Sequence, residues 1–313
     1  MIKEEFYFDS RDGENRIHAV QYTPDDGNVR GIVQIVHGMA EYVERYENLA
    51  EFLTKRGILV TGEDHLGHGK SVSEGGSFGY FCEQDPATVV VRDVHRLKKI
   101  TEEQYPQVPY IILGHSMGSF IARNYLCRYG SGIDGAVIVG TGMQSSGLIF
   151  ASKAMAGIQK LFCGSKHVSH FIDKAAFGGY NKRIDSPRTS SDWLSRNTDN
   201  VDRYIADELC GFTFTVNGFQ TLFELIRRLQ KQENLEKVPQ NLPILMVSGE
   251  EDPVGDYGKG VHKACDSLKR AGVKNIIVKL YENDRHELLN EDDAETAMED
   301  IWQWICKEVP GIV

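Results

Sequence analysis

Short apolar segments alternate with amphipathic segments over much of this chain, and this alternation limits the folds it can adopt. Each apolar segment has the length of a strand, and the next segment repeats apolar residues with helical spacing. A strand–helix–strand order favours parallel strands, and near-continuous apolar strands are typical of a sheet covered on both faces. The predicted strands are Gly31–His37, Ile58–Glu63, Tyr110–Gly114, Gly135–Gly140, Pro243–Gly249 and Asn275–Tyr281.

The beginning of the chain follows a different pattern. Residues Glu4–Phe8 and His18–Tyr22 alternate in side-chain character and flank the polar turn Arg11-Asp12-Gly13. Such a pattern predicts an antiparallel hairpin. We therefore expect an α/β fold with a mostly parallel, doubly wound sheet that starts with a hairpin.

The alternation stops near residue 142 and returns near residue 241. Two helical stripes of apolar residues lie in this interval, one from Leu148 to Phe162 and one from Phe219 to Leu229. Irregular segments that contain Gly and Ser connect them. We predict that residues 1–142 and 241–313 form one α/β core, and that residues 143–240 form a helical cap subdomain inserted in it.

Composition excludes several classes of function. The net charge of −10 argues against nucleic acid as a partner. The six cysteines include no C-x-x-C pair, so they are expected to be free thiols of a reducing compartment. The N-terminal residues lack the pattern of a secretory signal, and no apolar run reaches about 18 residues. A cytoplasmic location is expected.

The segment Gly114-His115-Ser116-Met117-Gly118 matches the pattern G-x-S-x-G between a predicted strand and a predicted helix. A serine hydroxyl is a weak nucleophile, so it must be presented clear of the sheet and close to a base. A tight strand-to-helix turn achieves this, and glycines two positions away on each side prevent a clash. The setting predicts Ser116 as a catalytic nucleophile; a turn with an inert serine is the alternative.

A base and an acid are expected after the last two strands. His286 follows the strand that ends at Tyr281, so it can reach the same edge of the sheet as Ser116. The order Ser…Asp…His is the one that this architecture uses. Asp252 follows the strand that ends at Gly249 and is our choice for the acid that orients the imidazole. Glu250 and Glu251 lie in the same turn and remain alternatives.

Two backbone amides are expected to bind the oxyanion of the reaction. One donor usually follows the strand Gly31–His37, and the other belongs to the residue after the nucleophile. These positions are Met39 and Met117. Backbone N–H groups there would act where negative charge develops in the transition state.

Several of these segments together resemble the monoacylglycerol lipase and lysophospholipase group of α/β hydrolases, which are serine aminopeptidase S33-type hydrolases. They are His37-Gly38-Met39, the run from Asp64 to Ser71 (DHLGHGKS), Gly114–Gly118, His286-Glu287 and Asn290-Glu291. The resemblance implies hydrolysis of an ester in a small lipid with one acyl chain, through an acyl-enzyme intermediate and without a cofactor. We interpret Asp64 and its glycines as shaping a loop beneath the site. No metal site is predicted, because His65 and His68 lack Cys or Asp partners at suitable spacing.

The predicted cap is rich in aromatic residues. Phe212, Phe214 and Phe219 are candidates for the lining of an acyl-binding tunnel, and core packing explains them equally well. An apolar patch on the cap would allow transient contact with a membrane surface, whereas the negative net charge opposes strong electrostatic docking on anionic lipid.

Two other functions remain open from the sequence. An aminopeptidase or amidase would need an acidic subsite for a protonated amine, for which Asp185, Asp192 and Asp202 are candidates. A catalytically silent binding protein is a weaker alternative, since such proteins commonly lose a member of the triad and all three are present here.

Overall fold

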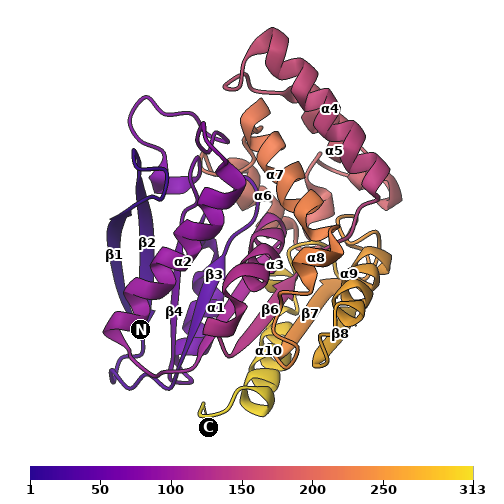
Figure 1. Cartoon of the computed structure of the whole chain (residues 1–313). Helices are drawn as coiled ribbons and strands as arrows, with labels where there is room; N and C mark the ends of the chain where they lie inside the picture. The colour runs from indigo at the N-terminus through magenta and orange to yellow at the C-terminus, as the bar shows by residue number, and fades with distance from the viewer. Residues whose placement is uncertain (313) are drawn as a thin grey trace.

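The computed structural model describes residues 1–312 and is built around one eight-stranded sheet (Figure 1). The strand order is β1-β2-β4-β3-β5-β6-β7-β8. The pairs β1–β2 and β2–β4 are antiparallel and the other neighbouring pairs are parallel. The predicted hairpin and mostly parallel sheet are confirmed. The strands are β1 (Ile2–Asp9), β2 (Arg16–Thr23), β3 (Gly31–Val36), β4 (Ile58–Glu63), β5 (Tyr110–His115), β6 (Gly135–Val139), β7 (Ile244–Gly249) and β8 (Ile276–Tyr281).

The side chains of the central strands contribute to two hydrophobic cores, one on each face of the sheet. Successive side chains of a strand point to opposite faces. On β5, Ile111 and Leu113 therefore pack in one core, whereas Ile112 packs in the other. Residues of α1 (Glu47–Thr54) and α10 (Ala294–Glu308) fill the first core, and residues of α2 (Pro86–Gln104), α3 (Met117–Tyr129) and α9 (Lys259–Arg270) fill the second. The sheet is thus covered on both faces, as its apolar strands predict.

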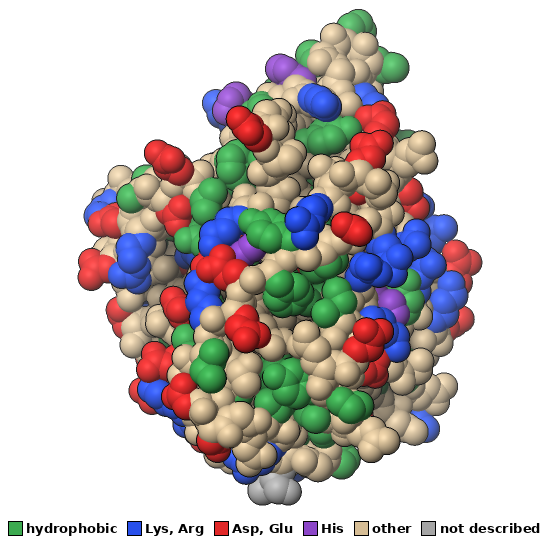
Figure 2. Space-filling model, turned by 90° about the vertical axis from the view of Figure 1, so that its left-hand side faces the viewer, with side chains coloured by type: hydrophobic (Ala, Val, Ile, Leu, Met, Phe, Trp, Pro, Cys, Tyr) green, Lys and Arg blue, Asp and Glu red, His purple; other side chains and the backbone are tan. Residues whose placement is uncertain are grey.

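The segment between β6 and β7 consists mainly of helices. The predicted limits at residues 143 and 240 both fall in connections between elements. Helix α7 packs against α3 and α4 and buries its apolar side. Helices α4 and α5 lie farther out and form the projecting top of the molecule (Figures 1 and 2). The helices are α4 (Ser146–Cys163), α5 (His170–Phe177), α6 (Thr198–Ala206), α7 (Val216–Leu229) and α8 (Gln232–Leu235).

Within residues 1–312, no helix has both the length and the apolar character needed to cross a bilayer.

Candidate active site

Ser116 occupies a sharp turn between β5 and α3. Its backbone has φ 54° and ψ −120°, a conformation that is costly for a residue with a side chain. A Cβ atom on Gly118 would lie 1.9 Å from the carbonyl oxygen of Val36, and one on Gly114 would lie 2.5 Å from that of Gly118. The two glycines are therefore required by the close approach of β3, β5 and α3, which raises Ser116 above the sheet edge.

His286 and Asp252 are joined by a buried hydrogen bond. The Nδ1 atom of His286 lies 3.0 Å from Oδ2 of Asp252, and the exposed fractions of the two side chains are 2% and 0%. Asp252 also accepts hydrogen bonds from the Ser248 hydroxyl and from the backbone N–H of Val254. With Asp252 ionised, Nδ1 carries the proton and Nε2 is left free to act as a base.

The two other acids of the same turn point away from the imidazole environment. Glu250 and Glu251 are exposed, whereas Asp252 is fully buried. Among the three, only Asp252 has a hydrogen bond with His286 in the described residues. The geometry thus brings Asp252 and His286 together from the loops after β7 and β8.

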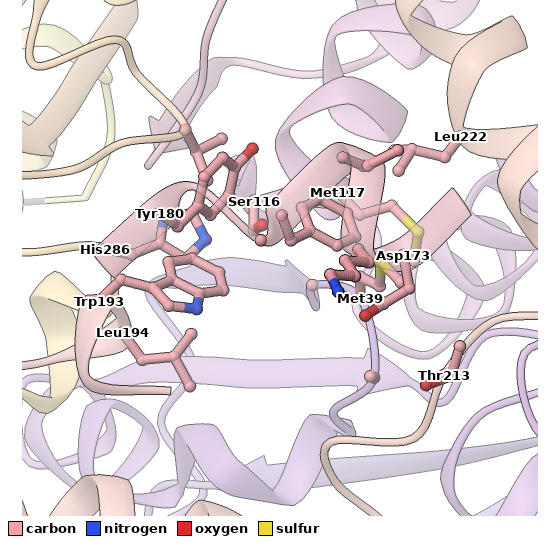
Figure 3. Close-up of a pocket in the computed structure, with 18 of the residues that line it drawn as sticks. Met39, Ser116, Met117, Asp173, Tyr180, Trp193, Leu194, Thr213, Leu222 and His286 are labelled. Atoms are coloured by element: carbon pink, nitrogen blue, oxygen red, sulfur yellow. The ribbon is translucent and has the colours of Figure 1, made fainter. Parts of the chain in front are cut away.

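Ser116 and His286 line one cavity of about 660 Å³ (Figure 3). The hydrogen bonds within residues 1–312 do not include one between the Ser116 hydroxyl and the His286 ring. Such contacts are often long in a protein without substrate and shorten in the reacting complex. The arrangement can support nucleophilic attack by a serine on a carbonyl placed in this cavity.

Met39 and Met117 also line this cavity. The amide of Met117 is in the first turn of α3, where helical N–H groups have no partner inside the helix. The Gly38 carbonyl accepts a hydrogen bond from Nδ1 of His37 at 2.8 Å, with the ring in that tautomer. Because C=O and N–H of a trans peptide point in opposite directions, this bond directs the Met39 N–H away from His37.

A buried network of charged and polar side chains surrounds the loop of Gly38 and Met39, and the sequence patterns did not reveal it. The Oε1 atom of Glu41 accepts hydrogen bonds from the Gly38 N–H at 2.5 Å and from the Tyr46 hydroxyl at 2.8 Å. The His115 ring lies 3.2 Å from the same oxygen, and its Nε2 donates to the His286 carbonyl at 3.1 Å. His115 therefore links the turn that carries Ser116 to the loop that carries His286.

Charge pairing opposes the effect of burial on the pKa values of Glu41 and His115. Burial opposes charge on Glu41, but the His115 hydrogen bond and the charge of Arg45 hold the pKa of Glu41 below its usual range. Burial likewise opposes charge on His115, and Glu41 raises its pKa above the ordinary value. Arg45 also binds both carboxylate oxygens of Glu287, at 2.7 and 2.8 Å. A charged residue a few positions after His37 was the only sequence signal for this network.

The run from Asp64 to Ser71 supports the site from below. Asp64 accepts hydrogen bonds from the backbone N–H groups of Val43 and Lys70 and contacts Nδ1 of His18. The His65 ring stacks on His37 with 4.0 Å between ring centroids, and burial lowers the pKa of both. Within residues 1–312, no group of three or more His, Cys, Asp or Glu side chains is placed to hold a metal ion.

The wall of the cavity is largely apolar. Of the three phenylalanines that were candidates for the lining of an acyl-binding tunnel, Phe212 lies on this wall. Phe214 and Phe219 are fully buried behind it and pack against each other with ring centroids 5.8 Å apart. For these two residues, core packing is the better interpretation, because both are fully buried and neither lines the cavity. The apolar wall comes instead from Leu148, Ile149, Met155, Leu222, Phe223 and Ile226.

The acids proposed for an amine subsite do not line this cavity. Asp192 accepts hydrogen bonds from the backbone of Arg188 and from Thr189, and Asp202 pairs with the Arg188 side chain. Asp185 is exposed. Among the described residues, the carboxylates on the cavity wall are those of Glu41, Glu287 and Asp173.

Comparison with known proteins gives one consistent picture. The model of the family described as "Serine aminopeptidase, S33" matches residues 27–293. The chain is 27% identical over 293 residues to monoglyceride lipase of Rattus norvegicus, covering 92% of this chain and 86% of the relative. It is 28% identical over 298 residues to monoacylglycerol lipase of Mycolicibacterium smegmatis, covering 95% of each.

Solved structures agree with this picture. A thermostable carboxyl esterase from Bacillus coagulans, solved in complex with glycerol, superposes with a TM-score of 0.92 at 31% identity over 100% of both chains. A monoglyceride lipase variant from Saccharomyces cerevisiae superposes with a TM-score of 0.76 over 99% of this chain and 96% of the other. Its identity is 20%, so this second likeness shows the fold alone.

Proposed function

This chain belongs to the serine aminopeptidase S33 family, and we propose that it hydrolyses the ester of a single-chain lipid through an acyl-enzyme on Ser116. Within that family it is an α/β hydrolase of the monoacylglycerol lipase group and a carboxylic ester hydrolase. The observation that carries the proposal is the buried His286–Asp252 pair facing the same cavity as Ser116.

In the proposed reaction, Ser116 Oγ attacks the ester carbonyl while His286 Nε2 takes its proton. The amides of Met39 and Met117 hold the oxyanion, each donor contributing about 3 kcal/mol to the lowering of the barrier. His286 then gives its proton to the leaving alcohol and activates water to release the fatty acid. Asp252 stabilises the imidazolium and keeps the ring in the required tautomer. No cofactor takes part.

The shape and lining of the cavity support a lipid substrate. A volume of about 660 Å³ is within the range of pockets that enclose a drug-sized ligand. Its apolar wall suits an acyl chain, and residues 143–240 supply much of that wall. We therefore assign these residues the role of a cap that selects the substrate, with a monoacylglycerol or a lysophospholipid as the expected class.

The proposal extends to the surroundings of the enzyme. Four large apolar side chains of α4 have exposed fractions of 59% or more, namely Phe150, Ile158, Leu161 and Phe162. We propose that this face of α4 makes transient contact with a lipid surface.

All six cysteines are free in the described structure, which fits a protein that works in the reducing cytoplasm.

Substitution of Ser116 tests the nucleophile. Ser116→Ala is expected to abolish turnover of a p-nitrophenyl ester while leaving the unfolding temperature unchanged. A fluorophosphonate should label the wild type at Ser116 and leave the variant unlabelled. Wild-type rates in the purified variant would refute the assignment.

A substrate panel then separates the esterase from an amidase. An amidase substrate belongs in the panel because of Asp173. The carboxylate of this residue lines the cavity and has no ion pair within residues 1–312. Burial raises the pKa of Asp173, and only His170 opposes this effect. We expect hydrolysis of monoacylglycerols, lysophospholipids or short esters to exceed that of an aminoacyl anilide; the reverse order would favour the aminopeptidase.

A further inference from the structure

The indole of Trp193 lies against the imidazole of His286. The two ring centroids are 5.1 Å apart and the planes meet at 39°. Trp193 is part of the short 3₁₀ helix Asp192–Leu194, which belongs to the inserted segment, and it lines the cavity beside Tyr180 (Figure 3). Tyr180 packs edge-on against the indole with 4.9 Å between centroids. A residue outside the α/β core thus touches the proposed base.

The backbone on both sides of Trp193 is fastened to the residues on both sides of His286. The Arg285 guanidinium donates to the Asp192 carbonyl at 2.7 Å and to the Ser195 carbonyl at 3.1 Å. The Glu287 N–H donates to the Leu194 carbonyl at 2.7 Å. These bonds fix the register between the two segments and thereby place the Trp193 backbone where its indole can lie against the imidazole.

A third set of bonds extends this attachment to Glu291. Its buried carboxylate accepts hydrogen bonds from the Ser195 hydroxyl at 2.8 Å and from the Arg196 N–H at 2.8 Å. The same carboxylate accepts from the Arg285 N–H at 2.9 Å. Glu291 therefore joins residues 192–196, which we call the base clamp, to the segment immediately before His286.

We propose that the base clamp is a positioning device for the catalytic base, and that Trp193 is the residue through which it acts. The inference rests on the proposed function, since it assigns His286 the role of base. The imidazole must hold Nδ1 on Asp252 while Nε2 faces Ser116, and the indole restricts its rotation and shields it from water. An aromatic face also favours the imidazolium that forms as Ser116 attacks.

Contact energies of this kind predict a change in turnover rather than in binding. An aromatic pair contributes about 0.5–1.5 kcal/mol, which corresponds to roughly two- to tenfold in rate. We expect Trp193→Ala to lower kcat of a short p-nitrophenyl ester about tenfold with KM changed less than about twofold. Trp193→Phe should recover most of the rate, because it keeps an aromatic face. The matched control is Trp302→Phe on α10, at the opposite end of the molecule from α4 (Figure 1).

A second variant tests the clamp without changing the indole. Ser195→Ala removes the hydrogen bond to Glu291 and is expected to lower kcat about threefold, again with little change in KM. In an NMR spectrum, the proton between His286 and Asp252 should exchange with water faster in Trp193→Ala than in the wild type. If Trp193→Ala fails to fold, Ser195→Ala and Trp193→Phe decide the question by the same measurements.

Fluorophosphonate labelling separates failure of the clamp from failure of the proposed function. If wild type is not labelled at Ser116, the proposed function is wrong, and the proposed role of the base clamp is refuted as well. If wild type is labelled and the folded variants react at the wild-type rate with unchanged kcat, the clamp alone is refuted. A loss that appears only in KM, or a Phe variant as slow as the Ala variant, also refutes it. Slower labelling that the Phe variant restores supports it.

Discussion

Burial distinguishes Asp252 from its two acidic neighbours. The sequence places three carboxylates in the turn after β7, and each of them is close enough in sequence to reach the imidazole. The structure exposes Glu250 and Glu251 and encloses Asp252 between Ser248, Val254 and His286. Which acid pairs with His286 depends on the direction of each side chain in the folded turn. Residue spacing does not convey that direction.

The first prediction concerns this acid. Asp252→Asn is expected to lower kcat by about 10⁴-fold, the loss known when an amide replaces a triad carboxylate and favours the wrong tautomer of histidine. Steady-state hydrolysis of a p-nitrophenyl ester measures it. Glu251→Gln in the same turn is the matched control and should keep the wild-type kcat. Equal losses in the two variants would contradict the assignment of Asp252.

Helices α4 and α7 show why the inserted segment was harder to interpret from sequence than the core. Both have apolar residues at helical spacing. The apolar side of α7 is buried between α3 and α4, whereas Leu161 and Phe162 at the end of α4 have exposed fractions of 84% and 85%. Periodicity identifies an apolar side of a helix but not what covers it. Phe214 and Phe219 were ambiguous for the same reason.

The second prediction concerns the exposed side of α4. Leu161→Ser combined with Phe162→Ser should weaken binding to phosphatidylcholine vesicles at least about tenfold, because each large apolar side chain contributes about 1.5–3 kcal/mol when buried. Hydrolysis of a soluble short-chain ester should not change. Vesicle sedimentation and ester kinetics measure the two effects.

Ile2→Ser on β1 is the control for this element, because Ile2 is also exposed but lies far from α4 (Figure 1). It should leave vesicle binding unchanged. Equal binding by wild type and the double variant would refute contact of α4 with lipid.

For the molecule as a whole, strand and helix order was predictable because apolar strands and amphipathic helices encode it locally. The sharp strand-to-helix turn at Ser116 was predictable too, because glycines stand at the two positions, 114 and 118, where a side chain would clash. The network of Glu41, Arg45 and Glu287 and the contact of Trp193 with His286 were not, because they join segments more than 90 residues apart. Contacts of that range follow from the packing of the complete fold.

A third prediction concerns stability of the whole fold against pH. Asp93 on α2 accepts hydrogen bonds from the Ser10 hydroxyl and from the Arg11 N–H, and these bonds join the turn of the N-terminal hairpin to α2. Burial raises the pKa of Asp93 to about 7 despite these bonds. An aspartate of the unfolded chain titrates near 3.9. Between these values the folded state binds the proton more tightly, so the free energy of unfolding falls as pH rises through this window.

Asp93→Asn removes this titration. Between pH 5 and pH 8, the free energy of unfolding should therefore fall about 2 kcal/mol less in the variant than in the wild type. Urea unfolding at the two pH values measures the difference. The same pH dependence in both proteins would show that Asp93 does not titrate in this range.

The pairing of β6 with β7 has a consequence for engineering this enzyme. About a hundred residues separate these strands in sequence, yet the strands pair in parallel, so the end of β6 and the start of β7 lie at opposite edges of the sheet. A donor segment spliced between them must therefore cross the length of the sheet, as the native segment does, to preserve the parallel pairing. Such a graft would import a new specificity, but turnover would survive only if residues 192–196 were retained or the donor brought its own aromatic partner for the histidine.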